Sequence, residues 1–308
     1  MGKVAFVFPG QGAQKVGMGK EAFDSLPAAR RVFEAADAAL GEKLSQLCFE
    51  GPEEALKLTA NTQPAVLTTA IALFEAFADR CDLTAGHSLG EYAAHVCAGT
   101  LSFEDAVRIV RVRGTYMQEA VPLGEGAMAA VMGLGREVVD RLCRETTGIV
   151  EPVNYNCPGQ IVVAGSAQGV ATATEALKAA GGKAIALPVS APFHSSLMTP
   201  AEERLKAVLM AATLSPPRCP VYVNVDAEPV VTAAAARDGL VRQVSRPVRW
   251  EESVRRMIAD GATLFVEIGP GKVLTGLIGR IDKSVQRVNI ETPADFERAR
   301  SAIAAARS

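Results

Sequence analysis

The stretch that constrains the fold most is Leu83-Thr84-Ala85-Gly86-His87-Ser88-Leu89-Gly90, followed by a mostly apolar run to Ala98. Its first three residues are typical of the end of a strand, and residues 89–98 are typical of a helix. The segment between them matches G-x-S-x-G, a pattern that places a serine on a sharp turn from a strand into a helix. Glycines two residues to either side of Ser88 let the backbone and a partner approach closely. The stretch therefore predicts an α/β fold with the hydroxyl of Ser88 projecting from such a turn.

Short apolar strands alternate with longer helical patterns on both sides of this turn, which is typical of an α/β domain with a mostly parallel sheet. Strands are expected over residues 3–8, 83–87, 221–225, 264–268 and 287–290. Helices are expected over residues 28–40, 64–78, 89–98, 103–120, 201–212 and 251–259.

Residues 126–189 have a different order of predicted strands and helices. They are expected to form a strand (127–134), a helix (137–146), two strands (149–155 and 160–164), a helix (168–180) and a strand (183–189). This β-α-β-β-α-β order is the ferredoxin-like arrangement, which is a self-contained unit. Pro122-Leu123-Gly124 and Ser190-Ala191-Pro192 flank it as hinges. We therefore expect a large α/β catalytic domain of residues 1–123 and 193–308, with a small ferredoxin-like domain of residues 124–192 inserted in it.

The composition excludes several classes of protein. An apolar share of 49% and a charged share of 21% in 308 residues are those of an ordinary globular protein. The 32 basic and 34 acidic residues give a net charge of −2, so no basic footprint for nucleic acid is expected. The longest apolar stretch, residues 64–78, contains Glu75 and is shorter than the roughly 20 residues of a membrane-spanning helix. The N-terminal apolar run is too short for a signal peptide, and we expect a cytoplasmic protein without a membrane partner.

The cysteines and histidines give no sign of a metal site. The six cysteines contain no C-x-x-C pair and are expected to be reduced thiols. The three histidines have no metal-ligand spacing with each other or with cysteine. No metal is therefore expected.

A serine nucleophile needs a base, and few histidines could serve Ser88. His87, on the adjacent strand position, is expected to point to the opposite face. His95 lies on the helix after the turn, roughly 10 Å along its axis. His194, which follows the inserted domain, remains as the candidate base. The alternatives are that Ser88 only caps a helix, and that His194 only packs or binds a loop carbonyl.

Arg113 occupies an unusual position on the helix expected over residues 103–120. It lies on the same side as an apolar face, whereas Arg108 and Arg111 point away. A buried guanidinium needs an anion, because an unpaired buried charge costs several kcal/mol. That anion could be an internal carboxylate, or the side chain could reach out to solvent. It could also be a substrate carboxylate, held by two parallel hydrogen bonds. Such a site would disfavour acetyl and longer alkyl thioesters, which leave the guanidinium unpaired.

Several segments, taken in order, closely resemble the malonyl-CoA:acyl-carrier-protein transacylase family, and the resemblance runs nearly from end to end. The segments are Phe8-Pro9-Gly10-Gln11-Gly12-Ala13-Gln14, Gln63-Pro64-Ala65, Gly86-His87-Ser88-Leu89-Gly90-Glu91-Tyr92, Arg111-Val112-Arg113-Gly114 with Met117-Gln118, Asn156-Cys157-Pro158-Gly159-Gln160, His194, Leu240-Val241-Arg242-Gln243 and Glu267-Ile268-Gly269-Pro270-Gly271-Lys272. So many matches in order are far more specific than any one motif. The resemblance implies a hydrolase-like large α/β domain with a ferredoxin-like insert.

The resemblance also implies roles for individual residues. Ser88 corresponds to the nucleophile, His194 to the general base and Arg113 to the residue that binds the malonyl carboxylate. The backbone amides of Gln11 and Leu89 are implied to form the oxyanion hole, and the backbone carbonyl of Gln243 to orient the histidine. Gln63 is implied to line the pocket. The bulky Phe193 is implied to leave no room for a 2-methyl branch on the acyl group.

The implied function is transfer of a malonyl group from malonyl-CoA to the phosphopantetheine thiol of an acyl carrier protein, through an ester on Ser88. Coenzyme A is a substrate and is released, so no bound cofactor is expected. The partner is an acyl carrier protein of fatty-acid or polyketide synthesis, and the enzyme is expected to be a monomer.

Two other functions stay open from the residues. A serine esterase or thioesterase shares the serine turn but has no need for the guanidinium of Arg113. A non-catalytic carrier-binding protein would dock an acidic carrier through basic side chains. The candidates for such a surface are Arg242, Arg246, Arg249, Arg255 and Arg256, which could equally be a solvated helix and loop.

Overall fold

The computed structural model describes residues 2–189 and 191–308, so that Ser190 of the expected hinge lies outside the described residues. The larger of its two sheets has six strands in the order β10-β9-β1-β2-β7-β8. All neighbours in this sheet run parallel except β7 and β8. The strands are β1 (Lys3–Phe8), β2 (Leu83–Gly86), β7 (Val221–Tyr222), β8 (Pro229–Val230), β9 (Ala262–Ile268) and β10 (Gln286–Ile290). The expected α/β class with a mostly parallel sheet is confirmed.

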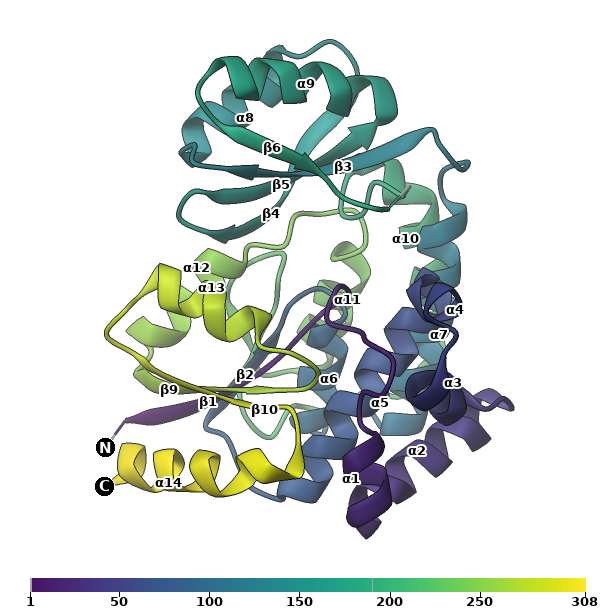
Figure 1. Cartoon of the computed structure of the whole chain (residues 1–308), viewed down its shortest axis with the longest axis vertical. Coiled ribbons are helices and arrows are strands. Elements are labelled where there is room, and N and C mark those ends of the chain that lie inside the picture. The colour runs from purple at the N-terminus through teal and green to yellow at the C-terminus, as the bar shows by residue number, and fades with distance from the viewer. Residues whose placement is uncertain (1, 190) are drawn as a thin grey trace.

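The helices of this large domain cover both faces of its sheet (Figure 1). They are α1 (Lys20–Ser25), α2 (Pro27–Leu40), α3 (Leu44–Glu50), α4 (Glu53–Lys57), α5 (Thr59–Phe77), α6 (Gly90–Cys97), α7 (Phe103–Glu119), α10 (Thr199–Ala211), α11 (Ala233–Arg242), α12 (Trp250–Ala259), α13 (Val273–Ile281) and α14 (Phe296–Arg307). The longest apolar stretch of the sequence, residues 64–78, lies almost entirely in α5, which is buried along most of its length. Among the described residues, no helix combines the length and hydrophobicity that crossing a bilayer requires.

Three expected boundaries were wrong by three residues or more. Helix α5 begins at Thr59 and runs through Pro64, whereas the proline was expected to start it. Strand β7 ends at Tyr222 rather than at Val225, because the chain turns at Asn224. Strand β6 (Lys183–Ala186) is shorter than the expected 183–189, since Pro188 cannot donate a ladder hydrogen bond.

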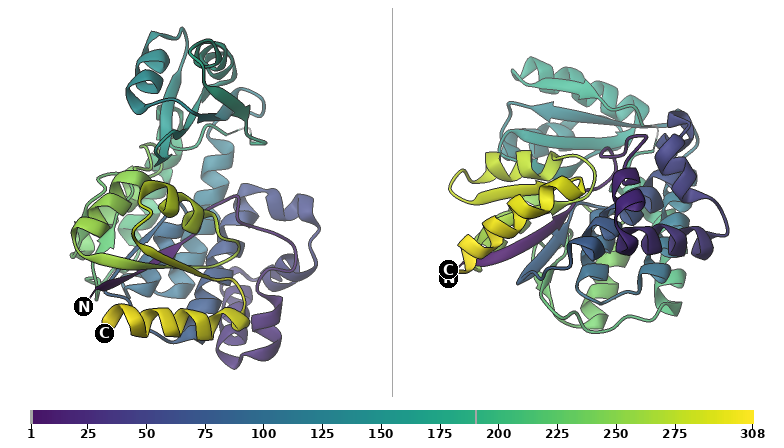
Figure 2. Two further views of the ribbon diagram at one scale, coloured as in Figure 1. Left: turned by 60° about the vertical axis from the view of Figure 1, so that its left-hand side comes forward. Right: turned by 60° about the horizontal axis from the view of Figure 1, so that its bottom comes forward.

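The second sheet has four antiparallel strands in the order β4-β5-β3-β6. Its elements are β3 (Gly126–Met132), α8 (Arg136–Glu145), β4 (Val150–Cys157), β5 (Gln160–Ser166), α9 (Ala167–Ala179) and β6. The first and third strands are central, as the ferredoxin-like arrangement requires. This small domain has its own buried core, including Val131, Val139 and Val163. It stands above the large sheet in every view (Figure 2). The boundaries at residues 124 and 192 stay a prediction.

The two domains also meet through backbone hydrogen bonds. Tyr155 N donates to Val248 O at 2.9 Å, and Val248 N donates to Val153 O at 2.8 Å. Phe193 packs against the apolar clusters of both domains. The inserted unit is therefore fastened to the large domain by β4 as well as by its two chain connections.

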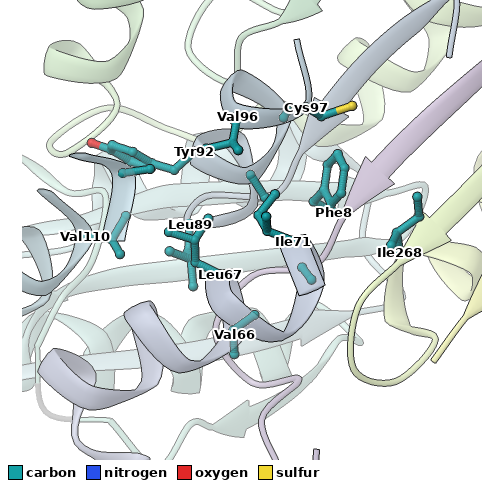
Figure 3. Packing of buried hydrophobic residues seen from close by; sticks show 14 of the residues in the cluster. Phe8, Val66, Leu67, Ile71, Leu89, Tyr92, Val96, Cys97, Val110 and Ile268 are labelled. Atoms are coloured by element: carbon teal, nitrogen blue, oxygen red, sulfur yellow. The ribbon is translucent and has the colours of Figure 1, made fainter. Parts of the chain in front are cut away.

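The serine turn rests on a tightly packed apolar core. Leu89 lies against Leu67 and Ile71 of α5, with Phe8 of β1 beside Ile71, whereas Tyr92 points toward the side of Val110 of α7 (Figure 3). All of these side chains are almost fully buried. Because protein interiors are close-packed, this core fixes where α6 begins.

The two ends of the chain adjoin on the side of the molecule opposite the small domain (Figure 1). The Gly2 N–H donates to the carbonyl of Ala306 on α14 at 2.9 Å.

Candidate active site

Ser88 lies on a strained turn between β2 and α6. Its φ is +50°, a value uncommon for a residue with a side chain. A Cβ atom at Gly86 would lie 1.9 Å from the backbone of Gly90, and one at Gly90 would lie 2.0 Å from the Phe8 carbonyl oxygen. Both positions therefore require glycine, and the turn predicted from the sequence is present.

Asn224, two residues beyond the end of the neighbouring strand β7, holds this turn. Its Oδ1 accepts a hydrogen bond from Ser88 N at 2.7 Å, and its Nδ2 donates to the Gly86 carbonyl at 2.7 Å. Sequence reasoning missed Asn224, because residues 221–225 were expected to be a simple strand and no motif drew attention to the residue.

His194 lies against Ser88 as a base must. Its Nε2 is 2.7 Å from Ser88 Oγ, and its Nδ1 is 2.7 Å from the backbone carbonyl oxygen of Gln243. A carbonyl only accepts hydrogen bonds, so the proton is on Nδ1 and the lone pair of Nε2 faces the hydroxyl. The position of His194 beside Ser88, with Gln243 behind it, is as the sequence predicted.

The environment keeps His194 neutral. Burial, together with the positive charge of Arg113, lowers the pKa of His194 to about 3. The imidazole is therefore free to accept a proton near neutral pH.

The other two histidines, His87 and His95, lie in other surroundings and do not act on Ser88. His87 Nε2 binds Asn156 Oδ1 at 2.8 Å, and the His87 ring lies near Trp250. His95 is fully buried on α6, with Glu91 as its nearest acid. Neither imidazole hydrogen-bonds to Ser88.

Arg113 reaches the nucleophile from α7. Its Nη2 donates to Ser88 Oγ at 3.2 Å and to Gln243 Oε1 at 2.9 Å, and its Nη1 donates to Gln63 Oε1 at 2.8 Å. The side chain is 1% exposed, so it does not reach out to solvent. No ion pair joins it to a carboxylate in the described part of the chain. Burial lowers the pKa of Arg113, with Tyr92 and Glu91 opposing the shift. Within the described residues its hydrogen-bond partners are neutral amides and a hydroxyl, and its guanidinium also lies over the Tyr92 ring, 5.6 Å from the ring centroid.

Gly114 allows this placement. A Cβ atom there would lie 2.7 Å from the Thr59 carbonyl oxygen and 2.8 Å from Ala60 Cα. The bare glycine therefore lets α7 approach the N-terminus of α5. The same approach brings Arg113 next to Gln63, which is 2% exposed on α5.

Gln11 and Leu89 both line the cavity that contains Ser88. Neither backbone N–H donates to another group in residues 2–189 and 191–308. Leu89 directly precedes α6, whose N-terminal N–H groups favour negative charge. Both amides are therefore available to an oxyanion at Ser88.

The cavity has a volume of about 740 Å³ and lies between the two domains. Large-domain residues Ser88, Arg113 and His194 line it, with Met128 and Asn154 from the small domain. Phe193 also lines it, next to His194. The predicted site residues Ser88, His194, Arg113, Gln11, Leu89, Gln63 and Phe193 are thus brought to one cavity. Gln243 contacts them from behind. No cluster of three or more metal-ligating side chains is present in the described residues.

The arginines considered for carrier docking are mostly neutralised by acids of the same chain. Arg242 pairs with Asp226 and Asp238, while Arg256 pairs with Glu228 and Asp260. Arg249 and Arg255 likewise pair with Glu252 and Glu251. This region therefore does not present an uncompensated basic surface.

Comparison with known proteins agrees with this geometry. Residues 5–295 match the family model described as the acyl transferase domain. A malonyl CoA-acyl carrier protein transacylase of Bacillus subtilis is 50% identical over 304 residues, covering 96% of both chains. An acyl-carrier-protein S-malonyltransferase of Bartonella henselae has a TM-score of 0.96 and 42% identity, covering 99% of this chain and 100% of that one.

A further solved structure contains a malonyl-transacylase in complex with its type II polyketide-synthase acyl carrier protein. It is similar with a TM-score of 0.94 and 44% identity, covering 96% of this chain and 98% of that one.

Proposed function

This chain belongs to the acyl transferase domain family, and from that membership and its active site we infer that it is a malonyl-CoA:acyl carrier protein transacylase. It transfers a malonyl group from malonyl-CoA to the phosphopantetheine thiol of acyl carrier protein, through an ester on Ser88. The single observation that carries the catalytic assignment is the convergence of Ser88 Oγ, His194 Nε2 and Arg113 Nη2 within 3.2 Å.

The first half-reaction forms the malonyl ester. His194 Nε2 takes the Ser88 proton as Oγ attacks the thioester carbonyl, and the imidazolium that forms is stabilised by the Gln243 carbonyl. We assign the oxyanion hole to the amides of Gln11 and Leu89. Coenzyme A leaves as a thiol after His194 returns the proton.

Arg113 accounts for the choice of a malonyl group. In a malonyl ester the carboxylate carbon is three bonds from Ser88 Oγ, a separation of about 4 Å by standard bond lengths. The guanidinium, which already touches Oγ, is at the right distance for the short diacid. An acetyl group would leave the charge unpaired, which is why we assign the specificity to this side chain.

The second half-reaction reverses these steps with a different thiol. The phosphopantetheine thiol loses its proton to His194 and attacks the ester carbonyl, and malonyl-carrier protein leaves. The product supplies extender units for fatty-acid synthesis, and a polyketide carrier is the alternative acceptor. We propose that the enzyme is a monomer. We also propose that it uses no bound cofactor, because its own side chains supply the nucleophile, the base and the carboxylate-binding group.

Labelled malonyl-CoA tests the assignment. Wild-type protein is expected to acquire one malonyl group and pass it to carrier protein, whereas Ser88→Ala is expected to acquire none. Ser284→Ala, at an exposed serine, is the control and should label normally. Label on Ser88→Ala would refute the nucleophile. Rapid release of free malonate without transfer to carrier protein would favour an esterase or thioesterase instead.

A further inference from the structure

A carboxylate lies directly behind the malonyl site, and the mechanism above does not use it. Glu91 is on the first turn of α6 and is 0% exposed. Its Oε2 accepts hydrogen bonds from Gln243 Nε2 at 2.8 Å and from Asn224 N at 2.7 Å. Its Oε1 has no hydrogen-bond partner in the described part of the chain.

Gln243 connects this carboxylate to Arg113. The side-chain oxygen of Gln243 accepts a hydrogen bond from Arg113 Nη2 at 2.9 Å, and its Nε2 donates to Glu91 Oε2 at 2.8 Å and to the Ser88 carbonyl oxygen at 3.0 Å. An ionised carboxylate only accepts hydrogen bonds and a guanidinium only donates them. The two charged groups therefore allow one orientation of the amide between them, and the Ser88 carbonyl favours the same one. The backbone carbonyl of the same residue binds His194 Nδ1.

The arrangement also separates the two charges. A buried guanidinium next to a carboxylate would be neutralised by it and would lose the donors that a substrate needs. Here one amide side chain stands between Arg113 and Glu91. Burial raises the pKa of Glu91 to about 7, while the N–H groups of Asn224 and Gln243 and the charge of Arg113 oppose this shift. His95, four residues along the helix, has its pKa lowered to about 3 by burial, so it is neutral and does not take the place of Arg113 as counter-charge.

We propose that Glu91 is a positioning residue for malonyl recognition. Its carboxylate holds the Gln243 amide so that the amide oxygen faces Arg113, and this keeps the guanidinium beside Ser88 with donors free for the substrate carboxylate. The inference rests on the proposed function and adds a specific residue to it.

A purely structural role makes a different prediction. Glu91 also accepts from Asn224 N, and Asn224 holds the Ser88 turn. If Glu91 served only this turn, its loss would impair every reaction of Ser88. If it acts through Arg113, its loss would impair only reactions of acyl groups that carry a carboxylate.

The experiment is a double-mutant cycle of Glu91→Gln and Arg113→Ala. Acyl-enzyme formation is measured by intact mass with malonyl-CoA at pH 8, where Glu91 is mostly ionised, and reaction of the same serine with p-nitrophenyl acetate is measured in parallel. Glu267→Gln is the matched control, since Glu267 is 1% exposed and binds the N–H groups of Leu274 and Thr275 away from the cavity.

Glu91→Gln is expected to slow malonylation about tenfold and to change the ester reaction less than about twofold. In the Arg113→Ala background it is expected to change malonylation less than about twofold. Glu267→Gln is expected to leave the ratio of the two rates unchanged. If Glu91→Gln does not fold, Glu91→Asp replaces it, because the shorter side chain withdraws the carboxylate from Gln243 Nε2; the same selective loss is expected.

Equal losses with both substrates, additive losses in the double variant, or no loss at all would each overturn the inference. An equal change of the rate ratio in Glu267→Gln would overturn it too. A wild-type protein that forms no malonyl ester would instead refute the proposed function, and the inference with it.

Discussion

His194 is held in a single tautomer, and its burial has a consequence for pH dependence. A base must be neutral to accept a proton, and the lowered pKa, about 3, keeps His194 neutral well below the ordinary histidine value of about 6.5. With p-nitrophenyl acetate, the rate of Ser88 acylation is therefore expected to stay roughly constant from pH 8 to about pH 5.

A stopped-flow pH series checks this, and an inflection near pH 6.5 would contradict it. The charge of Arg113 also lowers the pKa of His194. In Arg113→Ala the acid limb is therefore expected to move to higher pH.

We expect Phe193 to be the side chain that limits the width of the acyl site. It lines the cavity directly beside His194. Phe193→Ala is expected to raise acylation by methylmalonyl-CoA relative to malonyl-CoA by about tenfold, in line with the roughly 1–3 kcal/mol that a methyl group is worth in a pocket. Intact-mass measurement with both thioesters tests this. Phe103→Ala, at a partly buried phenylalanine packed against the main core of the large domain, is the control, and an unchanged ratio in Phe193→Ala would rule Phe193 out.

The individual site residues were predictable to different degrees. Ser88 could be recognised because the G-x-S-x-G turn is a local pattern, and Arg113 because a charge on an apolar helix face is a local anomaly. Asn224 has neither property, since it contacts the Ser88 turn from a loop that follows β7 and is distant in sequence. Glu91 stood inside a recognised motif, but nothing in the sequence indicated that it contacts Gln243.

Helix α7 holds Arg113 in place through a close approach that only glycine permits. In Gly114→Ala the added Cβ would lie 2.7 Å from the Thr59 carbonyl oxygen, so α7 must shift. We expect a loss of about 1–3 kcal/mol in the free energy of unfolding, and a larger loss of malonylation than of ester reaction.

Urea unfolding and the two acylation assays test the effect of this shift. Gly276→Ala is the control, because it lies in α13 with nothing within 4 Å of an added Cβ. Its unfolding free energy is expected to be unchanged or slightly higher. Equal behaviour of the two variants would contradict the packing argument.

Helix α6 contains a histidine that destabilises it. His95 is 0% exposed, and neither ring nitrogen has a hydrogen-bond partner within the described residues. His95→Leu is expected to raise the free energy of unfolding by about 1–3 kcal/mol at pH 8.

The gain in His95→Leu should increase in acid. Below pH 6.5 the unfolded chain binds a proton at His95 that the folded chain, with a pKa of about 3, does not bind. The wild type therefore loses stability as the pH falls, and the expected gain is about 2 kcal/mol larger at pH 5 than at pH 8. Urea titrations at both pH values measure it, and an equal gain would disprove the linkage.

The long elements were predicted well and the short ones were not. Helices such as α7 have a sustained apolar face that local periodicity reveals. Strand β7 has only two residues and depends on pairing with β2. The start of α5 was misplaced because Pro64, a usual helix breaker, is accommodated among buried neighbours.

The molecule as a whole forms its substrate cavity from both domains, so a bound substrate should restrain both. Residues 187–189 of the small domain line the cavity opposite Ser88. In Ser88→Ala, which cannot turn over, malonyl-CoA is expected to slow hydrogen exchange in peptides that cover residues 187–189. Peptides of α14 serve as the control. Protection confined to the large domain would contradict a shared site.

The arrangement of the two domains was only partly accessible from sequence. The β-α-β-β-α-β order identified the insert, because each of its elements has its own periodicity. The backbone pairing of Tyr155 with Val248 was not predictable, since it joins residues of different domains without a local signal.

The pairing of Gly2 with Ala306 leaves both chain ends on the face farthest from the small domain. Polypeptide extending from either end would therefore leave the molecule without crossing the entrance to Ser88. The same unit could be inserted into a longer multienzyme chain, or circularly permuted by joining its ends through a short linker. In either case the phosphopantetheine group of a carrier protein would still have access to Ser88.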